Sequence, residues 1–311
     1  MLLGGKISIV IPVYNSEYTL EILVARVRSV LIEMQREFEI ILVDDCSLDC
    51  SWDALRKLKA SHGPQLKIAR LLKNSGQHNA ILCGFSLATG DVIVTMDDDL
   101  QNPPEEIPKL VDQIDRGYDL AIGAYDYKKH GTLRNASGGL IDRVQRSIFH
   151  LPDEFQLTSF RAVRKIVVQN VNHMGGVFPY VTCMLLSHTS KYVNVPVRHD
   201  PRVVGDSNYT IGRSVPLVAN LIFSYSSLPV TLLGVICLGA FCFSIFLGSV
   251  VAIRALLFGS SVPGWSSTVV ILSFLNALIL MCLFIFGIYL SRFYQLLTRT
   301  RVSFTMSELH E

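Results

Sequence analysis

The segment VIVTMDDDLQNPP, residues 92–104, carries the clearest structural signal in the chain. Its apolar and β-branched residues predict a buried strand, and the Pro-Pro pair ends any regular element. Three adjacent carboxylates, Asp97, Asp98 and Asp99, follow that strand, and they repel one another unless a cation or a hydrogen-bond donor lies among them. The segment therefore predicts a divalent-metal site, with a solvated acidic turn as the simpler alternative.

Around this segment, short apolar runs alternate with stretches of helical periodicity. Strands are expected at 6–13, 38–43, 66–72, 92–96 and 118–123, and helices at 17–35, 52–60, 77–88 and 105–116. Ser16 is expected to cap the first of these helices. The alternation predicts an α/β fold with a mostly parallel, Rossmann-like sheet, right-handed crossovers and helices on both faces.

A second acidic pair, Asp44 and Asp45, follows the strand expected at 38–43. In an open, mostly parallel sheet the carboxyl ends of the strands share one edge, and ligands bind there. Both acidic clusters are therefore expected at the same edge, where a single ligand could contact them.

Composition separates the chain into two physical classes. Half of its residues are hydrophobic and 17% are charged, and the apolar excess lies in the last third, so 1–210 is expected to form the globular domain. The net charge of +2 and the lack of a basic run interleaved with aromatics make nucleic acid an unexpected partner. The seven cysteines are scattered without a metal-knuckle spacing, which indicates reduced thiols.

Two uncharged segments, 229–253 and 268–291, are long enough to cross a hydrocarbon core of about 30 Å as helices. Residues 211–228 read as an amphipathic helix on the membrane surface, 254–267 as a short external loop and 292–311 as a tail. Arginines flank the pair of spans, with a single Arg254 between them. The positive-inside rule then places both termini in the cytoplasm.

Three segments between the strands and the spans join an arginine to small polar residues. They are Arg134-Asn-Ala-Ser137, Ser159-Phe-Arg161 and Arg202-Val-Val-Gly-Asp-Ser207-Asn-Tyr209. Guanidinium, hydroxyl and amide groups suit an anion, especially a phosphate. Each segment taken alone is a weak match, and many of the other basic residues in this region are expected to be solvated.

Taken together, these motifs resemble those of the family-two glycosyltransferases with the A-type nucleotide-sugar fold. Within that family the chain is most similar to the polyprenyl-phosphate group, which includes dolichyl-phosphate mannose synthases and bacterial undecaprenyl-phosphate sugar transferases. The resemblance rests on VIPVYN (10–15), VDDCSLD (43–49), MDDDLQNPP (96–104), RVVGDSNY (202–209) and the two C-terminal spans, and it covers nearly the whole chain.

The resemblance implies roles for individual residues. Residues lining the nucleotide pocket would be Pro12, Tyr14, Asn15 and Glu17, with Asp44 or Asp45 meeting the base. A Mg²⁺ or Mn²⁺ ion would be held by Asp97 and Asp99, with Gln101 as a possible third contact and Asp98 nearer the donor sugar. The catalytic and acceptor-phosphate side would include Arg134, Ser137, Arg161, Arg202 and Ser207. Some relatives have Asp where this chain has Ser159, and many have Lys at the position of Asn208.

The implied reaction is an inverting, metal-dependent transfer of a sugar from a nucleotide-diphosphate sugar to undecaprenyl or dolichyl phosphate. The product would be a lipid-linked monosaccharide for cell-envelope biogenesis, and the enzyme would lie in a membrane, the bacterial inner membrane being the expected one. Two alternatives remain: a processive polysaccharide synthase, and a non-catalytic membrane subunit that binds nucleotide sugar. The sequence leaves open the sugar, the choice among UDP, GDP and dTDP, and whether the chain forms a homo-oligomer.

Overall fold

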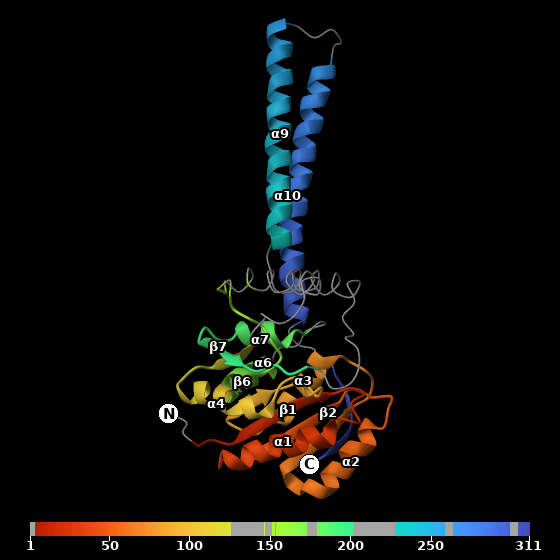
Figure 1. Cartoon of the computed structure of the whole chain (residues 1–311). Coiled ribbons are helices and arrows are strands. Elements are labelled where there is room, and N and C mark those ends of the chain that lie inside the picture. Colours follow the sequence, from red (N-terminus) through yellow and green to blue (C-terminus); the bar gives the residue numbers. More distant parts are fainter. Residues whose placement is uncertain are drawn as a thin grey trace. The chain divides into compact units, whose positions relative to one another are not determined.

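The computed structural model describes residues 4–125, 146, 151–152, 154–172, 179–201, 228–258, 264–298 and 304–311. Two compact units result, one formed by Met1–Val218 together with Arg299–Glu311 and the other by Ala219–Thr298. The first unit therefore contains the end of the chain as well as its beginning (Figure 1).

The first unit is built on an eight-stranded sheet in the order β7-β5-β6-β4-β1-β2-β3-β8. Its strands are β1 (Ile7–Val13), β2 (Phe38–Asp44), β3 (Leu66–Leu71), β4 (Val92–Thr95), β5 (Leu120–Tyr125), β6 (Arg161–Arg164), β7 (Tyr192–Val197) and β8 (Met306–His310). β1 pairs in parallel with β2 and β4, β2 with β3, and β5 with β7. The predicted mostly parallel α/β sheet is confirmed.

Two strands run against the parallel direction. β6 lies between β4 and β5 and is antiparallel to both, and β8 is antiparallel to β3. β6 therefore brings Ser159 and Arg161 beside the end of β4, which carries the acidic segment. β8 makes residues 306–310 an edge strand, where the sequence had indicated only a tail.

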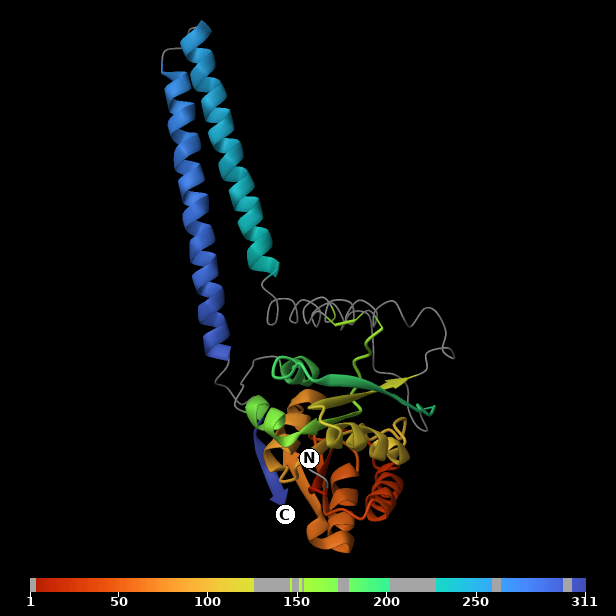
Figure 2. The ribbon, with the colours of Figure 1, turned by 90° about the vertical axis from the view of Figure 1, so that its left-hand side faces the viewer.

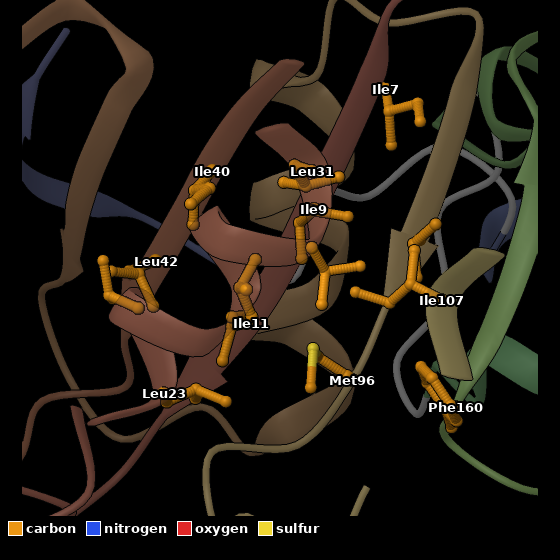
Figure 3. Packing of buried hydrophobic residues seen from close by; sticks show 14 of the residues in the cluster. Ile7, Ile9, Ile11, Leu23, Leu31, Ile40, Leu42, Met96, Ile107 and Phe160 are labelled. Carbon is orange, nitrogen blue, oxygen red and sulfur yellow. The ribbon is translucent and has the colours of Figure 1, made fainter. Parts of the chain in front are cut away.

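Helices cover both faces of the sheet. The connecting helices are α1 (Leu20–Glu33), α2 (Ser51–His62), α3 (Gln77–Leu87), α4 (Ile107–Asp115), α6 (Lys165–Asn172) and α7 (Val181–Leu186), with short 3-10 turns η1 (Gly63–Gln65) and η2 (Pro104–Glu106). One face of β1, with Ile7, Ile9 and Ile11, packs in the same core as α1, α2 and α4 (Figure 3). The opposite face meets α3, where a Cβ added at Gly84 would lie 2.3 Å from Val10.

The first helix begins later than the sequence indicated. It starts at Leu20 with Thr19 at the N-cap and without a side-chain cap, so the prediction that Ser16 caps it is wrong. The Ser16 hydroxyl instead donates to Asp98 and to the carbonyl of Tyr14. Ser16 therefore does not cap α1 and instead connects the loop after β1 to the acidic segment.

The second unit contains α9 (Leu228–Phe258) and α10 (Trp265–Thr298), two long helices that run side by side (Figures 1 and 2). Each contains a window apolar and long enough to cross a membrane, Gly234–Val251 and Ser267–Ser291. Only 17% and 6% of these windows are buried, so most of their apolar side chains are exposed. Both helices extend beyond the predicted spans, whereas the surface helix predicted at 211–228 lies almost entirely outside the described residues.

Candidate active site

The loops after β1 and β2 are joined by a set of hydrogen bonds. The Asn15 backbone N–H donates to Ser47 Oγ at 3.0 Å, and the Asn15 side chain accepts from the Leu48 N–H at 2.9 Å. Glu17 accepts from the Cys50 N–H at 3.0 Å. Asn15 adopts a positive φ of 53°, which asparagine tolerates better than most residues. These bonds connect the two loops at Asn15 and Glu17, which the resemblance implies as lining of a nucleotide pocket.

Pro12 and Tyr14, the other predicted nucleotide-pocket residues, lie beside the same loops. Pro12 is buried within β1 opposite Val43 of β2. Tyr14 directly follows β1 and is 40% exposed, so its ring is accessible from solvent. The structure therefore brings all four predicted residues of this wall to the carboxyl edge of the sheet.

The two carboxylates at the end of β2 are buried. Asp44 is fully buried, 3.1 Å from Arg70 Nε, and accepts from the Ser47 N–H. Asp45 accepts from the N–H groups of Ser75 and Gly76 at 2.7 and 2.8 Å. Burial raises the pKa of both carboxyl groups, while the hydrogen bonds act in the opposite direction. The predicted base-contacting pair thus shapes two loops at this edge.

Asp98 faces the loop after β1. Its Oδ2 accepts from the Tyr14 N–H at 3.0 Å and from the Ser16 hydroxyl, and its carbonyl accepts from Thr19 Oγ1 at 2.8 Å. Burial raises the pKa of this carboxyl to about 6. Asp98 therefore joins the acidic segment to the predicted nucleotide wall, and its contact with a donor sugar stays a prediction.

Asp97 is held from two directions. Oδ1 accepts from Gln77 Nε2, at the start of α3, and Oδ2 accepts from the Ser159 hydroxyl, just before β6. Thr95 Oγ1 donates to the Ser159 carbonyl at 2.7 Å, so the contact continues the β4–β6 pairing. Neither Gln77 nor the role of Ser159 was anticipated, although the Ser-Phe-Arg segment had already been singled out.

Asp99 and Gln101 form the outer part of the segment. The Gln101 N–H donates to Asp99 Oδ1 at 3.2 Å, and Leu100 between them has a positive φ of 62°. The segment after β7 contacts this turn, where the Asp200 N–H donates to the Gln101 carbonyl at 2.9 Å. His199 lies 3.5 Å from Gln101 Nε2 and stacks on Tyr125 with a centroid distance of 4.2 Å.

The donor atoms of this segment suit Mg²⁺ or Mn²⁺. Both ions prefer oxygen, and Mg²⁺ commonly takes only one or two protein carboxylates beside substrate phosphates. Asp97 and Asp99 would supply the carboxylates. Among the described residues, the hydrogen bonds of the Gln101 side chain use Nε2, so its Oε1 would be available to a cation. Within the described residues no group of three or more His, Cys, Asp or Glu could hold a metal ion by itself. A cation held here would therefore need further oxygen ligands from a bound substrate, such as those of a diphosphate.

Arg161 lies in the interior, at 1% exposure. Its Nε donates to Thr95 Oγ1 at 3.0 Å and its guanidinium to Thr182 Oγ1 at 2.7 Å, and burial lowers its pKa to about 10. The half-buried His78 ring lies against Tyr180, and desolvation lowers its pKa to about 3, so the imidazole is neutral. Through these bonds Arg161 links β6 to β4 and to α7, and its predicted role on the acceptor-phosphate side stays a prediction.

Four predicted residues of the acceptor side, Arg134, Ser137, Arg202 and Ser207, lie outside the described residues. Their assignment stays a prediction. In the sequence, residues 198–201 directly precede Arg202 and are described by the structure. Within them, Asp200 contacts Gln101 through a backbone hydrogen bond.

Residues 8–172 match the model of glycosyl transferase family 2, and the chain belongs to this family. It is 34% identical over 255 residues to undecaprenyl-phosphate 4-deoxy-4-formamido-L-arabinose transferase of Klebsiella pneumoniae (strain 342), covering 82% of this chain and 74% of the relative. The corresponding protein of a second Klebsiella pneumoniae strain matches equally well. The chain is thus a glycosyltransferase related to polyprenyl-phosphate sugar transferases.

Solved structures support the fold. Glucosyl-3-phosphoglycerate synthase from Mycobacterium tuberculosis, in complex with Mn²⁺, UDP and phosphoglyceric acid, matches with a TM-score of 0.51 and 17% identity, over 71% of this chain and 77% of that one. Another structure of the same synthase matches with a TM-score of 0.51 and 18% identity, over 71% and 79%. At this identity the likeness establishes the A-type sheet architecture alone.

Proposed function

We propose that this glycosyltransferase moves a sugar from a nucleotide-diphosphate sugar to a polyprenyl phosphate, with inversion at the anomeric carbon and with a divalent cation. The observation that carries the proposal is the acidic segment itself. Asp97 and Asp99 lie at the carboxyl edge of the sheet, and Asp98 ties them to the loop that holds Tyr14 and Asn15. The relative's name supports the acceptor, because it specifies undecaprenyl phosphate.

The chemistry needs charge stabilisation at the leaving group. Breaking the anomeric bond leaves negative charge on the nucleoside diphosphate, and a bound Mg²⁺ or Mn²⁺ supplies Lewis-acid stabilisation there. Asp97 and Asp99 would hold that ion, and Gln77 and Ser159 keep the Asp97 carboxylate in a fixed orientation. A group held in advance loses little free energy to reorganisation during the reaction.

The acceptor does not require a strong general base. The second pKa of a phosphate monoester is about 6, so the attacking oxygen is already anionic near neutral pH. Ser159 stands where some relatives have a carboxylate, and its hydroxyl donates to Asp97. This residue is therefore suited to orienting the acidic segment, and positioning of the acceptor by cationic groups becomes the larger contribution to rate.

The membrane arrangement follows from the same acceptor. A polyprenyl chain stays in the bilayer while the nucleotide sugar is soluble, so the catalytic unit must work at the membrane surface. β8 follows α10 in the chain and pairs with β3 of the catalytic sheet, which supports an even number of crossings and both chain ends on one side. The excess of flanking arginines favours the cytoplasm, and the bacterial inner membrane is the proposed location.

A donor panel tests the proposal. Membranes containing the full chain are supplied with undecaprenyl or dolichyl phosphate and with UDP-, GDP- and dTDP-linked sugars, with Mg²⁺ or Mn²⁺ and with excess chelator. We expect one metal-dependent lipid-linked monosaccharide, identified by mass. A polymeric product would favour a processive synthase. Donor binding without release of nucleoside diphosphate under every condition would favour a non-catalytic subunit.

A further inference from the structure

The chain's last strand, β8, borders the part of the sheet that forms the predicted nucleotide side. β8 pairs with β3 from Ile68 to Leu71, and the Leu72 N–H then donates to the Thr305 carbonyl at 2.8 Å. The Ser307 hydroxyl also donates to the Arg70 carbonyl at 3.1 Å. The contact therefore continues to the carboxyl end of β3, which is the end that faces the site.

Arg70 connects this edge to Asp44. Its Nε lies 3.1 Å from the Asp44 carboxylate, and its guanidinium donates to the Ser47 carbonyl at 3.3 Å. Asp44 is fully buried, so removing the Arg70 guanidinium would take away the positive charge that offsets the buried carboxylate charge, at a cost in folding free energy. Ser47 in turn accepts from the Asn15 N–H, so Arg70 is one step from the pocket wall.

Arg70 also contacts an aromatic ring that β8 contacts. The guanidinium carbon lies 5.6 Å from the ring centroid of Trp52, a cation–π geometry. His310 contacts the same Trp52 ring with a centroid distance of 5.9 Å and an interplanar angle of 45°. Trp52 lies on α2, is 5% exposed and belongs to the hydrophobic core, so its ring connects Arg70 and His310 to that core.

The end of β3 also leads to the turn that holds Asp45. The Ser75 and Gly76 N–H groups that donate to this carboxylate lie only a few residues beyond Leu72, where the β8 contact ends. Both acidic residues at the end of β2 therefore contact groups at or just beyond the end of β3. Asp44 contacts Arg70, and Asp45 contacts the turn at Ser75 and Gly76.

We infer that β8 positions the nucleotide side of the active site, with His310 acting through Trp52 and Arg70 on the loop that follows Asp44. The segment after the second membrane helix is thereby a working part of donor binding. This inference rests on the proposed function, because the pocket is assigned to a nucleotide there. His310 is a positioning residue and touches no substrate.

The test compares substitutions on the two faces of β8. Side chains alternate along a strand, so Leu309 points away from the face that carries His310. His310→Ala removes the contact with Trp52, Leu309→Ala is the matched control, and His310→Phe restores an aromatic ring. All three are made in the full chain and studied in detergent or in bilayer discs.

The first readout is amide hydrogen exchange and does not depend on activity. We expect exchange in peptides covering Ser47, Leu48, Ser75 and Gly76 to become roughly two- to tenfold faster in His310→Ala, the range that an aromatic contact supports. Peptides covering α4 should be unchanged, and His310→Phe should restore protection. Equal exchange in His310→Ala and Leu309→Ala would overturn the inference.

The second readout uses the donor identified by the panel. His310→Ala should raise KM for the donor by a similar factor and leave kcat within about twofold, because the reacting groups are untouched. A fall in kcat with an unchanged KM would contradict the inference while leaving the proposed function intact. If no donor supports transfer, the proposed function fails, and the exchange experiment still decides whether β8 orders these loops.

Discussion

Glu39 offers a sharp test of how the catalytic sheet is stabilised. This carboxylate on β2 is 2% exposed and lies where β2 meets the turn before β4. Its partners are Ser8 Oγ at 2.6 Å, the Thr89 N–H at 2.7 Å, Thr89 Oγ1 at 2.9 Å, and the ammonium groups of Lys6 and Lys67, each at 3.1 Å. Burial opposes ionisation, but these donors together lower its pKa from 4.5 to about 2.

The lowered pKa sets the size of the effect. A difference between 4.5 in the unfolded chain and about 2 in the folded one corresponds to about 3 kcal/mol of folding free energy at neutral pH. Because the folded pKa is the lower one, this stability is present above pH 4.5 and is lost as the pH falls towards 2. At pH 3 about 1 kcal/mol should remain.

The variant Glu39→Gln removes the charge and keeps the shape, and Glu33→Gln on the exposed surface of α1 is the control. Thermal unfolding of the full chain in detergent, followed by tryptophan fluorescence, should give a melting temperature roughly 6–12 °C lower for Glu39→Gln at pH 7. The gap to the wild type should narrow by pH 3. Equal melting temperatures for Glu39→Gln and Glu33→Gln at pH 7 would refute the reasoning.

Three further predictions concern the acidic segment and its support. Ser159→Ala removes a donor to Asp97 and should lower kcat/KM about tenfold and raise the half-saturating Mn²⁺ concentration; an unchanged metal titration would count against the orienting role. Gly90→Ala would place a Cβ 2.7 Å from the Lys6 carbonyl oxygen and 2.8 Å from the Ser8 nitrogen. The free energy of unfolding, measured in urea, should therefore fall by about 1–3 kcal/mol. An unchanged free energy of unfolding would show that the strand moves to accommodate the methyl group without strain. Excess chelator should abolish transfer and added Mn²⁺ or Mg²⁺ should restore it, and persistent turnover in chelator would remove the metal from the mechanism.

The central strands of the catalytic sheet can be predicted from the sequence because they are continuous apolar runs. β1, β2 and β4 are buried on both faces, as in a parallel sheet covered by helices, and each ends in a loop of polar residues. Placing Asp44 and Asp97 at one edge required only the rule that parallel strands share a direction. That part of the candidate site followed from local pattern.

The antiparallel strands could not be found in the same way. β6 has only four residues, Arg161–Arg164, with a charge at each end, and β8 (Met306–His310) is exposed throughout and has no alternating apolar face. Both depend on partners far away in the chain: Ser307, for example, bonds to Arg70. Contacts of Asp97 with Gln77 and Ser159 have the same origin, because three separate segments meet there only after the sheet forms.

The most direct measurement of the central claim is transfer by Asp99→Asn, with Asp112→Asn on the outer surface of α4 as the control. Both variants are assayed in membranes with undecaprenyl phosphate and the donor that the panel identifies, and the lipid product is quantified by mass. The control should match the wild type, while Asp99→Asn should lose at least about a hundredfold in rate, as expected when leaving-group stabilisation is removed. Wild-type rates of lipid-linked sugar formation by a correctly folded Asp99→Asn variant would contradict the account.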